Sequence, residues 1–165
     1  MLKDMLIGEN AVKRGHFVLT SGKESEYYAD IKDACANPEI LKEIVRQISE
    51  KVKGEGVAGV ELGAVPIVVS VAYSLSIPYF IIRKEAKHGM KKLIIGNLRE
   101  GMNVDIIEDV VTTGGSVLRA VKLLRESGLK VSRVITVIDR EEGGKELLEK
   151  EGVDLISLLK IKDIL

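Results

Sequence analysis

The sequence predicts an α/β protein of three layers, with a mainly parallel central sheet of about five strands, helices on both faces and a small N-terminal hood. Apolar runs typical of buried strands alternate along the chain with segments that repeat apolar residues at helical spacing. Such alternation implies parallel strands joined by helical crossovers. The first 35 residues do not follow this alternation. We therefore expect a single domain over residues 1–165, with the hood in about residues 1–35 and the core in about residues 36–165.

The first half of the core alternates helix and strand. Residues 38–52 place Ile40, Ile44 and Ile48 at helical spacing between charged residues, and Gly54 follows the segment. Residues 57–60 form a short apolar run typical of a buried strand. A second helix is expected over residues 66–76, because proline is favoured at the first position of a helix, and a second strand over residues 78–82.

The second half continues the alternation after residues 83–101, which are rich in lysine and glycine and whose first half we interpret as a mobile loop. Strands are expected over residues 104–107 and 131–138, with a turn over residues 109–115. Helices are expected over residues 116–127 and 144–150. A last apolar run, residues 153–159, is typical of an edge strand.

Composition excludes several classes of function. Apolar residues make up 45% of the chain and charged residues 30%, which excludes a disordered chain. The 25 basic and 25 acidic residues cancel, so no overall basic field favours binding to nucleic acid or to a membrane. The N-terminal residues lack the apolar core of a secretion signal, and the lone Cys35 cannot form an internal disulfide. We expect a soluble, cytoplasmic protein whose partners are small molecules.

The strand ends predict where a ligand binds. In an open parallel sheet ligands bind beyond the carboxyl ends of the strands, so the turns after Val60, Ile82, Ile107 and Ile138 should face one crevice. The most informative of these turns places Glu108 and Asp109 before a run of hydroxyl and glycine residues that opens a helix. Backbone N–H groups at a helix start bind phosphate, and carboxylates accept hydrogen bonds from sugar hydroxyls. This order suits a phosphorylated sugar.

The glycine turn alone has a simpler interpretation, because serine, threonine and glycine are ordinary residues of capped turns. The complete order of strand, Glu108-Asp109, Thr112-Thr113-Gly114-Gly115 and helix is much more specific. It matches neither the P-loop pattern nor the dinucleotide pattern of three spaced glycines. The ligand-binding interpretation is therefore favoured.

This segment resembles the phosphoribosyl-diphosphate (PRPP) signature of the type I phosphoribosyltransferases. Residues 83–89 resemble the mobile catalytic loop of that family, residues 137–143 its orotate-contacting turn, and residues 17–30 its N-terminal hood. The resemblance extends from about Phe17 to about Leu159 and points to the orotate-using branch of the family. It implies transfer of a ribosyl 5-phosphate group from PRPP to orotate, with release of diphosphate, in pyrimidine (UMP) biosynthesis.

The resemblance also implies roles for individual residues. Lys84, Lys87 and His88 would be catalytic, and Thr112 and Arg140 would bind orotate. PRPP would be bound by Arg83, Lys84, Lys87, His88, Glu108, Asp109, Val110, Val111, Thr112, Thr113, Gly114, Gly115 and Ser116. The implied cofactor is Mg²⁺, held mainly by the sugar hydroxyls and the diphosphate, so no side chain is assigned as a metal ligand. The implied assembly is a homodimer with a shared active site.

Each assignment has an ordinary alternative. Arg140 by itself could be a solvated surface arginine, and the basic loop could be a solvated charged face. The adjacent Tyr27 and Tyr28 are typical of packing residues, so we leave both tyrosines out of the site. Two other functions remain possible: a transferase that uses a purine or uracil, and a non-catalytic regulator that senses PRPP and binds nucleic acid. The neutral charge and the absence of a helix-turn-helix segment count against the regulator.

Overall fold

The fold was analysed in a computed structural model of the chain, in which residues 1–19, 21–85 and 92–165 are described. Lys87, His88 and most of the loop predicted to be mobile lie outside the described residues. Among the described residues, no helix is both long enough and apolar enough to cross a membrane.

A six-stranded sheet forms the middle of the molecule. Its order is β5 (Ile94–Ile95), β4 (Tyr79–Ile82), β3 (Gly56–Val60), β6 (Val104–Val111), β7 (Arg133–Asp139) and β8 (Asp154–Lys160). Every neighbouring pair is parallel except β4 and β5, which are antiparallel. The prediction of a mainly parallel sheet is confirmed, and β8 lies at the edge as expected. The short β5 was not predicted as a strand.

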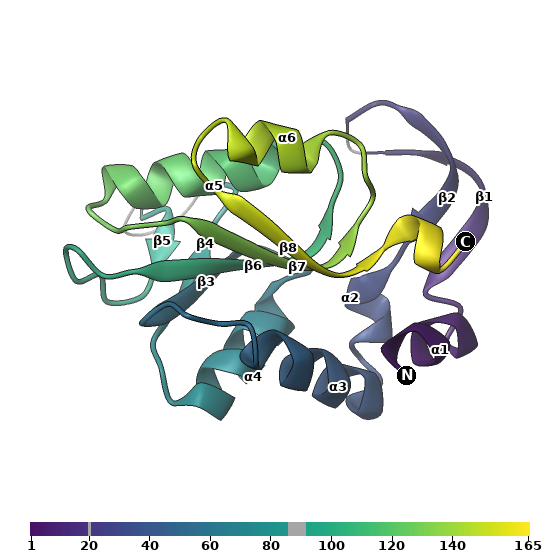
Figure 1. The fold of residues 1–165 in the computed structure, drawn as a ribbon, viewed down its shortest axis with the longest axis horizontal. Helices are drawn as coiled ribbons and strands as arrows, with labels where there is room; N and C mark the ends of the chain where they lie inside the picture. Colours follow the sequence, from purple (N-terminus) through teal and green to yellow (C-terminus); the bar gives the residue numbers. More distant parts are fainter. Residues whose placement is uncertain (20, 86–91) are drawn as a thin grey trace.

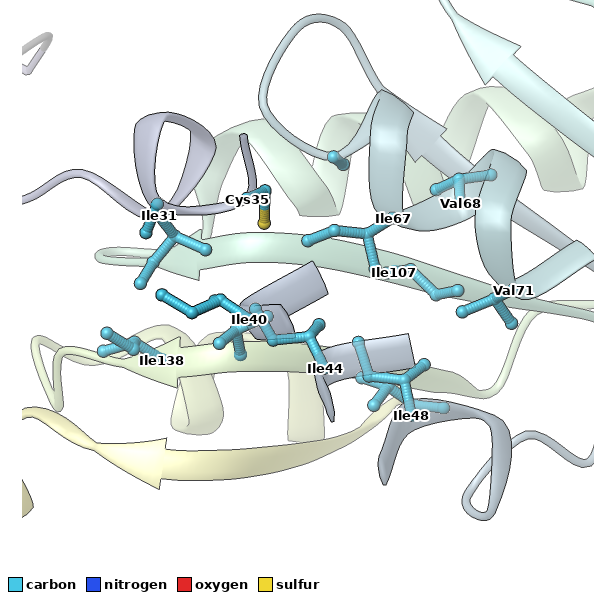
Figure 2. Close-up of a cluster of buried hydrophobic side chains, with 14 of the residues drawn as sticks. Ile31, Cys35, Ile40, Ile44, Ile48, Ile67, Val68, Val71, Ile107 and Ile138 are labelled. Atoms are coloured by element: carbon cyan, nitrogen blue, oxygen red, sulfur yellow. The ribbon is translucent and has the colours of Figure 1, made fainter. Parts of the chain in front are cut away.

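Helices cover both faces of this sheet (Figure 1). On one face lie α3 (Pro38–Ser49) and α4 (Val65–Leu75), and on the other lie α5 (Gly115–Glu126) and α6 (Gly144–Glu149). Ile40, Ile44 and Ile48 of α3 are at most 2% exposed. Figure 2 shows them packed with Ile107 and Ile138 of the sheet. Burying a side chain of this size stabilises the fold by about 1.5–3 kcal/mol, so the predicted helical stripe holds two of the three layers together.

The hood consists of α1 (Leu2–Gly8), an antiparallel pair β1 (Val12–Val18) and β2 (Glu24–Ala29), and the short α2 (Ile31–Ala34). Leu2, Leu6 and Ile31 are buried in the same apolar cluster as α3 and α4. The chain ends in a 3-10 turn (Ile161–Asp163), and Arg14 Nη2 donates to the backbone oxygen of Leu165 at 3.0 Å. The hood is therefore packed onto the core and tied to its C-terminal end.

Strand β6 is longer than predicted. The predicted turn over residues 109–115 is wrong at its start, because β6 continues to Val111. Its last residues still pair with β7, Val110 with Ile138 and Val111 with Asp139. Glu108 and Asp109 are consequently held on a hydrogen-bonded strand, and the turn is confined to residues 112–114.

Candidate active site

A cavity of about 510 Å³ lies between the hood and the carboxyl ends of the strands. The lining includes Glu61 after β3, Lys84 after β4, Glu108 in β6 and Arg140 after β7. The prediction that these four strand ends face one crevice is confirmed. The full set of lining residues is Val18, Leu19, Ser21, Tyr28, Ala29, Lys32, Val60, Glu61, Leu62, Gly63, Lys84, Glu108, Asp109, Val110, Thr112, Ser116 and Arg140.

A second cavity of about 260 Å³ is built from the turn between β6 and α5. Five residues line both this cavity and the larger one, so the two adjoin: Ser21, Glu108, Val110, Thr112 and Ser116. The remaining lining of the second cavity is Val111, Thr113, Gly114, Gly115 and Val117. Every residue of the predicted phosphate-binding run, 110–116, thus lies around one hollow.

Gly114 shapes this turn. It is the N-cap of α5 with φ 86° and ψ 0°, a left-handed conformation that side chains other than glycine rarely adopt. A Cβ on Gly114 would also lie 3.0 Å from the Cα of Gly144, where α6 begins. The first N–H groups of a helix have no intrahelical partner and carry partial positive charge. The turn therefore presents backbone donors and hydroxyl groups to the hollow.

Glu108 is buried, and its Oε1 has no hydrogen-bond partner among the described residues. The pKa of this carboxyl is raised to about 8, chiefly by burial and secondly by the neighbouring Asp109, against smaller opposing effects of the Val60 backbone and Lys84. Burial also raises the pKa of Asp109, although hydrogen bonds from the backbone at residues 109 and 110 oppose this. Two carboxyl groups whose pKa values are raised are suited to a ligand that brings hydroxyl donors or positive charge.

Gly63, in the turn after β3, fits against one of these carboxyl groups. A Cβ on Gly63 would collide with the side chain of Asp109. The neighbouring Glu61 accepts a hydrogen bond from the backbone N–H of Lys84, which connects the ends of β3 and β4. The Glu61–Leu62 peptide bond is cis. The backbone at Gly63 lies directly beside the Asp109 carboxyl group.

Arg140 is held from several sides. Its Nη2 donates to Ser25 Oγ at 3.0 Å and to Glu142 Oε1 at 3.2 Å, and its Nε donates to Tyr27 Oη at 3.2 Å. The guanidinium carbon lies 4.3 Å from the centre of the Tyr27 ring, and only 3% of the side chain is exposed. The alternative of a solvated surface arginine is wrong, because the hood covers this side chain.

The basic residues after β4 are only partly described. Lys84 lines the main cavity, whereas Arg83 lines a neighbouring one of about 380 Å³, together with Lys84, Arg119 and Lys122. Lys87 and His88 lie outside the described residues. Of the four predicted loop residues, Lys84 alone is therefore placed at the main cavity by the described part of the chain.

Six hood residues line the main cavity and were not predicted as site residues, namely Val18, Leu19, Ser21, Tyr28, Ala29 and Lys32. Tyr28 and Lys32 form an interacting pair among them. Lys32 Nζ lies 2.9 Å from Tyr28 Oη, 3.4 Å from Asp30 Oδ1 and 5.3 Å from the centre of the Tyr28 ring. The hydrogen bond with Tyr28 raises the pKa of Lys32. Tyr28 and Lys32 are four residues apart across the bend from β2 to α2, a proximity that no periodic pattern in the sequence indicates.

A metal ion at the described residues would need additional ligands from outside the protein. Among residues 1–19, 21–85 and 92–165, no group of three or more His, Cys, Asp or Glu side chains could hold one. The chemistry of Glu108 and Asp109 nevertheless fits a cation whose remaining ligands belong to a substrate, because Glu108 Oε1 is buried without a partner among those residues.

The sheet, the carboxylate pair and the glycine turn at a helix start define an α/β protein of the phosphoribosyltransferase class. The model of the phosphoribosyl transferase domain matches residues 27–159. The orotate phosphoribosyltransferase of Thermoplasma acidophilum is 48% identical over 163 residues, which are 99% of this chain and 95% of that protein.

Solved structures agree with this relationship. The crystal structure of orotate phosphoribosyltransferase from Aeropyrum pernix has a TM-score of 0.86 and 31% identity, covering 99% of this chain and 96% of that one. The Mycobacterium tuberculosis H37Rv orotate phosphoribosyltransferase in complex with PRPP has a TM-score of 0.77 and 30% identity, covering 99% and 98%. The chain belongs to the phosphoribosyltransferase family and, within it, to the orotate phosphoribosyltransferases.

Proposed function

We propose that this protein catalyses the reaction named for its family: it transfers the ribose 5-phosphate group of PRPP to N1 of orotate, giving orotidine 5'-monophosphate and diphosphate. The observation that carries the proposal is that the buried Glu108, the adjacent Asp109, the glycine turn and Arg140 lie around two adjoining cavities. Identity of 48% to an orotate phosphoribosyltransferase over nearly the whole chain supports the choice of base.

The 5-phosphate of PRPP binds in the smaller cavity. Backbone N–H groups at the start of α5 and the hydroxyls of Thr112, Thr113 and Ser116 donate to it, and Gly114 lets the backbone approach closely. The proposed contact residues here are Val110, Val111, Thr112, Thr113, Gly114, Gly115 and Ser116. This position leaves the sugar next to β6.

Glu108 and Asp109 accept hydrogen bonds from the ribose hydroxyls. Both carboxyl groups have raised pKa values in the ligand-free protein, so hydroxyl donors and nearby cations favour their ionised form on binding. A carboxylate pair at the ribose also stabilises positive charge that develops on the sugar as the bond to diphosphate breaks. Glu108 and Asp109 therefore act in both binding and reaction.

Mg²⁺ is the proposed cofactor. Glu108 and Asp109 are the described carboxylates that would face it, while the sugar hydroxyls and the diphosphate supply most of its ligands. The ion would neutralise charge on the leaving diphosphate. The residues of the chain that would also neutralise this charge follow β4 and are Arg83, Lys84, Lys87 and His88.

These four residues supply positive charge as diphosphate leaves. Lys84 is the described member that lines the main cavity, and Lys84, Lys87 and His88 are the proposed catalytic residues. Cations brought over the diphosphate in a site closed to water stabilise the charge that develops in the transition state. Arg83 and the same three residues are also proposed contacts for PRPP.

Orotate binds between Thr112 and Arg140, which line the same cavity. A guanidinium group donates charge-assisted hydrogen bonds to a carboxylate, so Arg140, whose Nη1 has no hydrogen-bond partner among the described residues, is suited to the carboxylate that distinguishes orotate from uracil. Burial of Arg140 strengthens this interaction, because a charged pair is screened less away from water.

The proposal extends to the assembly and the location of the enzyme. Residues 1–165 act as one domain, with the hood in about residues 1–35, and two copies form a homodimer in which loop residues reach the neighbouring site. Exposed apolar side chains on α4 and β4, Val69, Tyr73 and Tyr79, support such a contact. The reaction takes place in the cytoplasm, a location supported by the single, buried Cys35, which needs no oxidising compartment.

Two substitutions test the proposed roles. Asp109→Asn should lower kcat/KM for PRPP by about 100-fold, because the amide replaces an ionised acceptor at the ribose. Arg140→Ala should raise KM for orotate by about 100-fold and leave KM for PRPP nearly unchanged, because it removes a buried partner of the substrate carboxylate. Initial rates with each substrate varied in turn measure both effects. Unchanged kinetics in both variants would overturn the assignment.

A further inference from the structure

The hood contacts the arginine proposed to bind orotate. Ser25 Oγ and Tyr27 Oη, both on β2, accept two of the hydrogen bonds that Arg140 donates. The third hydrogen bond from Arg140 is accepted by Glu142, which lies in the same turn as Arg140. Arg140 is 115 and 113 residues away from these hood partners. The orientation of the guanidinium thus depends on a distant part of the chain.

The two hydroxyl groups differ from Glu142 in charge. Ser25 and Tyr27 orient the guanidinium without neutralising it, whereas Glu142 forms an ion pair with it. Nε and Nη2 are the nitrogens that these residues hold, and Nη1 has no hydrogen-bond partner among the described residues. Arg140 therefore has a donor group, Nη1, without a partner among those residues, in a cavity that Thr112 also lines.

The hood residues are themselves fixed. Ser25 and Tyr27 are two positions apart, so their side chains point to the same face of β2. Ser25 Oγ donates to the Tyr27 carbonyl at 2.8 Å and accepts from the Tyr27 N–H at 3.3 Å. The Tyr27 ring packs against the main apolar cluster. Because both residues are anchored, the positions of their hydroxyl groups are defined before substrate arrives.

We propose that Ser25 and Tyr27 are positioning residues that hold the Arg140 guanidinium in the orientation required to bind the orotate carboxylate. This inference rests on the function proposed above. It assigns to the hood a part in base recognition that is separate from covering the site. It also implies that loss of either hydroxyl affects orotate and leaves PRPP binding unaffected, because neither residue lines the hollow around residues 110–116.

Steady-state kinetics of Ser25→Ala and Tyr27→Phe test the proposal. The Phe variant keeps the ring over Arg140 and removes only the hydroxyl. Each variant should raise KM for orotate about fivefold to tenfold, with kcat and KM for PRPP within about twofold of wild type, since each loses one hydrogen bond to a charged group. Ser127→Ala is a matched control, because the Ser127 hydroxyl bonds only to the Leu123 backbone oxygen among the described residues and lies outside both cavities.

A double-mutant cycle separates positioning from a general loss of structure. In an Arg140→Ala background, Tyr27→Phe should leave kcat/KM for orotate unchanged, because the group that it positions is gone. The proposal would be overturned if Tyr27→Phe lowered kcat/KM for orotate equally in both backgrounds, or if KM for orotate were unchanged in both single variants. In either case, turnover by the wild-type enzyme would still support the proposed function. An inactive wild-type enzyme would overturn both. Ser25→Ala supplies an independent variant if Tyr27→Phe does not fold, as judged by its thermal midpoint.

Discussion

At the scale of single residues, Glu108 combines a stability cost with a proposed functional role. It is a carboxyl group in a buried position, with one oxygen that has no partner among the described residues. Such a group is costly unless a ligand satisfies it, and sites that bind ligands are where such costs are found. The folded protein holds its proton more tightly than the unfolded chain does, because its pKa rises from 4.5 to about 8.

This shift predicts how stability depends on pH. The raised pKa favours the folded state below about pH 4.5, and the benefit is lost as pH rises through about 8, on the order of a few kcal/mol in total. The free energy of unfolding of the ligand-free protein should therefore fall between about pH 5 and pH 9, and the fall should be clearly shallower in Glu108→Gln. Urea denaturation at a series of pH values measures this. The same slope in both proteins would contradict the buried, protonated carboxyl group.

Arg140 shows what the sequence could and could not predict at this scale. Its place after a strand-like run predicted that it faces the crevice, and the structure confirms this. Its hydrogen bonds to Ser25 and Tyr27 join residues more than 110 positions apart. No local pattern in either segment indicates such a pair, because each segment satisfies its own backbone without the other. From the sequence, Tyr27 was interpreted as a packing residue and left out of the site.

At the scale of elements, the site depends on how closely the ends of β3 and β6 approach each other. Gly63 follows β3 and Asp109 belongs to β6, and the two strands are neighbours in the sheet. The alternation of strands and helices predicted that these strands lie in one parallel sheet. It did not predict the end of β6, because Glu108 and Asp109 are polar and their strand conformation comes from pairing with β7. Tertiary pairing thus overrides the local preference for a turn.

Gly63→Ala tests this approach. The added Cβ would collide with the Asp109 carboxyl group, so the turn or the carboxylate must move. We expect KM for PRPP to rise about tenfold, because small displacements of a positioned group reduce binding and reaction. Gly8→Ala is the control, since its Cβ meets nothing within 4 Å and it lies at the end of α1. If Gly63→Ala and Gly8→Ala had the same kinetics, the close contact between Gly63 and Asp109 would not matter for binding PRPP.

At the scale of the whole molecule, the hood, the sheet and the C-terminal turn are joined. Leu2, Leu6 and Ile31 share one apolar cluster with α3 and α4, so the hood has no separate core. The sequence predicted a hood because its first 35 residues break the alternation and residues 17–30 resemble the N-terminal hood of the family, but the helices of the hood were not predicted. The short α2 buries only Ile31 and Ala34, too few positions to produce a recognisable helical period.

A mixing experiment tests the proposed shared site of the homodimer. Lys87→Ala and Asp109→Asn should each be nearly inactive. If Lys87 acts on the neighbouring subunit's site, an equal mixture that exchanges subunits should recover about a quarter of wild-type activity, because half of the dimers then hold one intact site. Assays before and after mixing and re-equilibration, with the dimer checked by sedimentation, measure the recovery. A mixture no more active than its components would contradict a site shared in this way.

The measurement that tests the central claim most directly is the loss of orotate ultraviolet absorbance when the purified protein is mixed with PRPP and Mg²⁺. Parallel reactions omit the metal or replace orotate with adenine, hypoxanthine or uracil. We predict turnover only in the reaction that contains orotate and Mg²⁺ together with PRPP, because Arg140 lies in the cavity where the carboxylate of the base would bind. Turnover of another base in preference to orotate, or no turnover of any base by protein that still binds PRPP, would contradict the account.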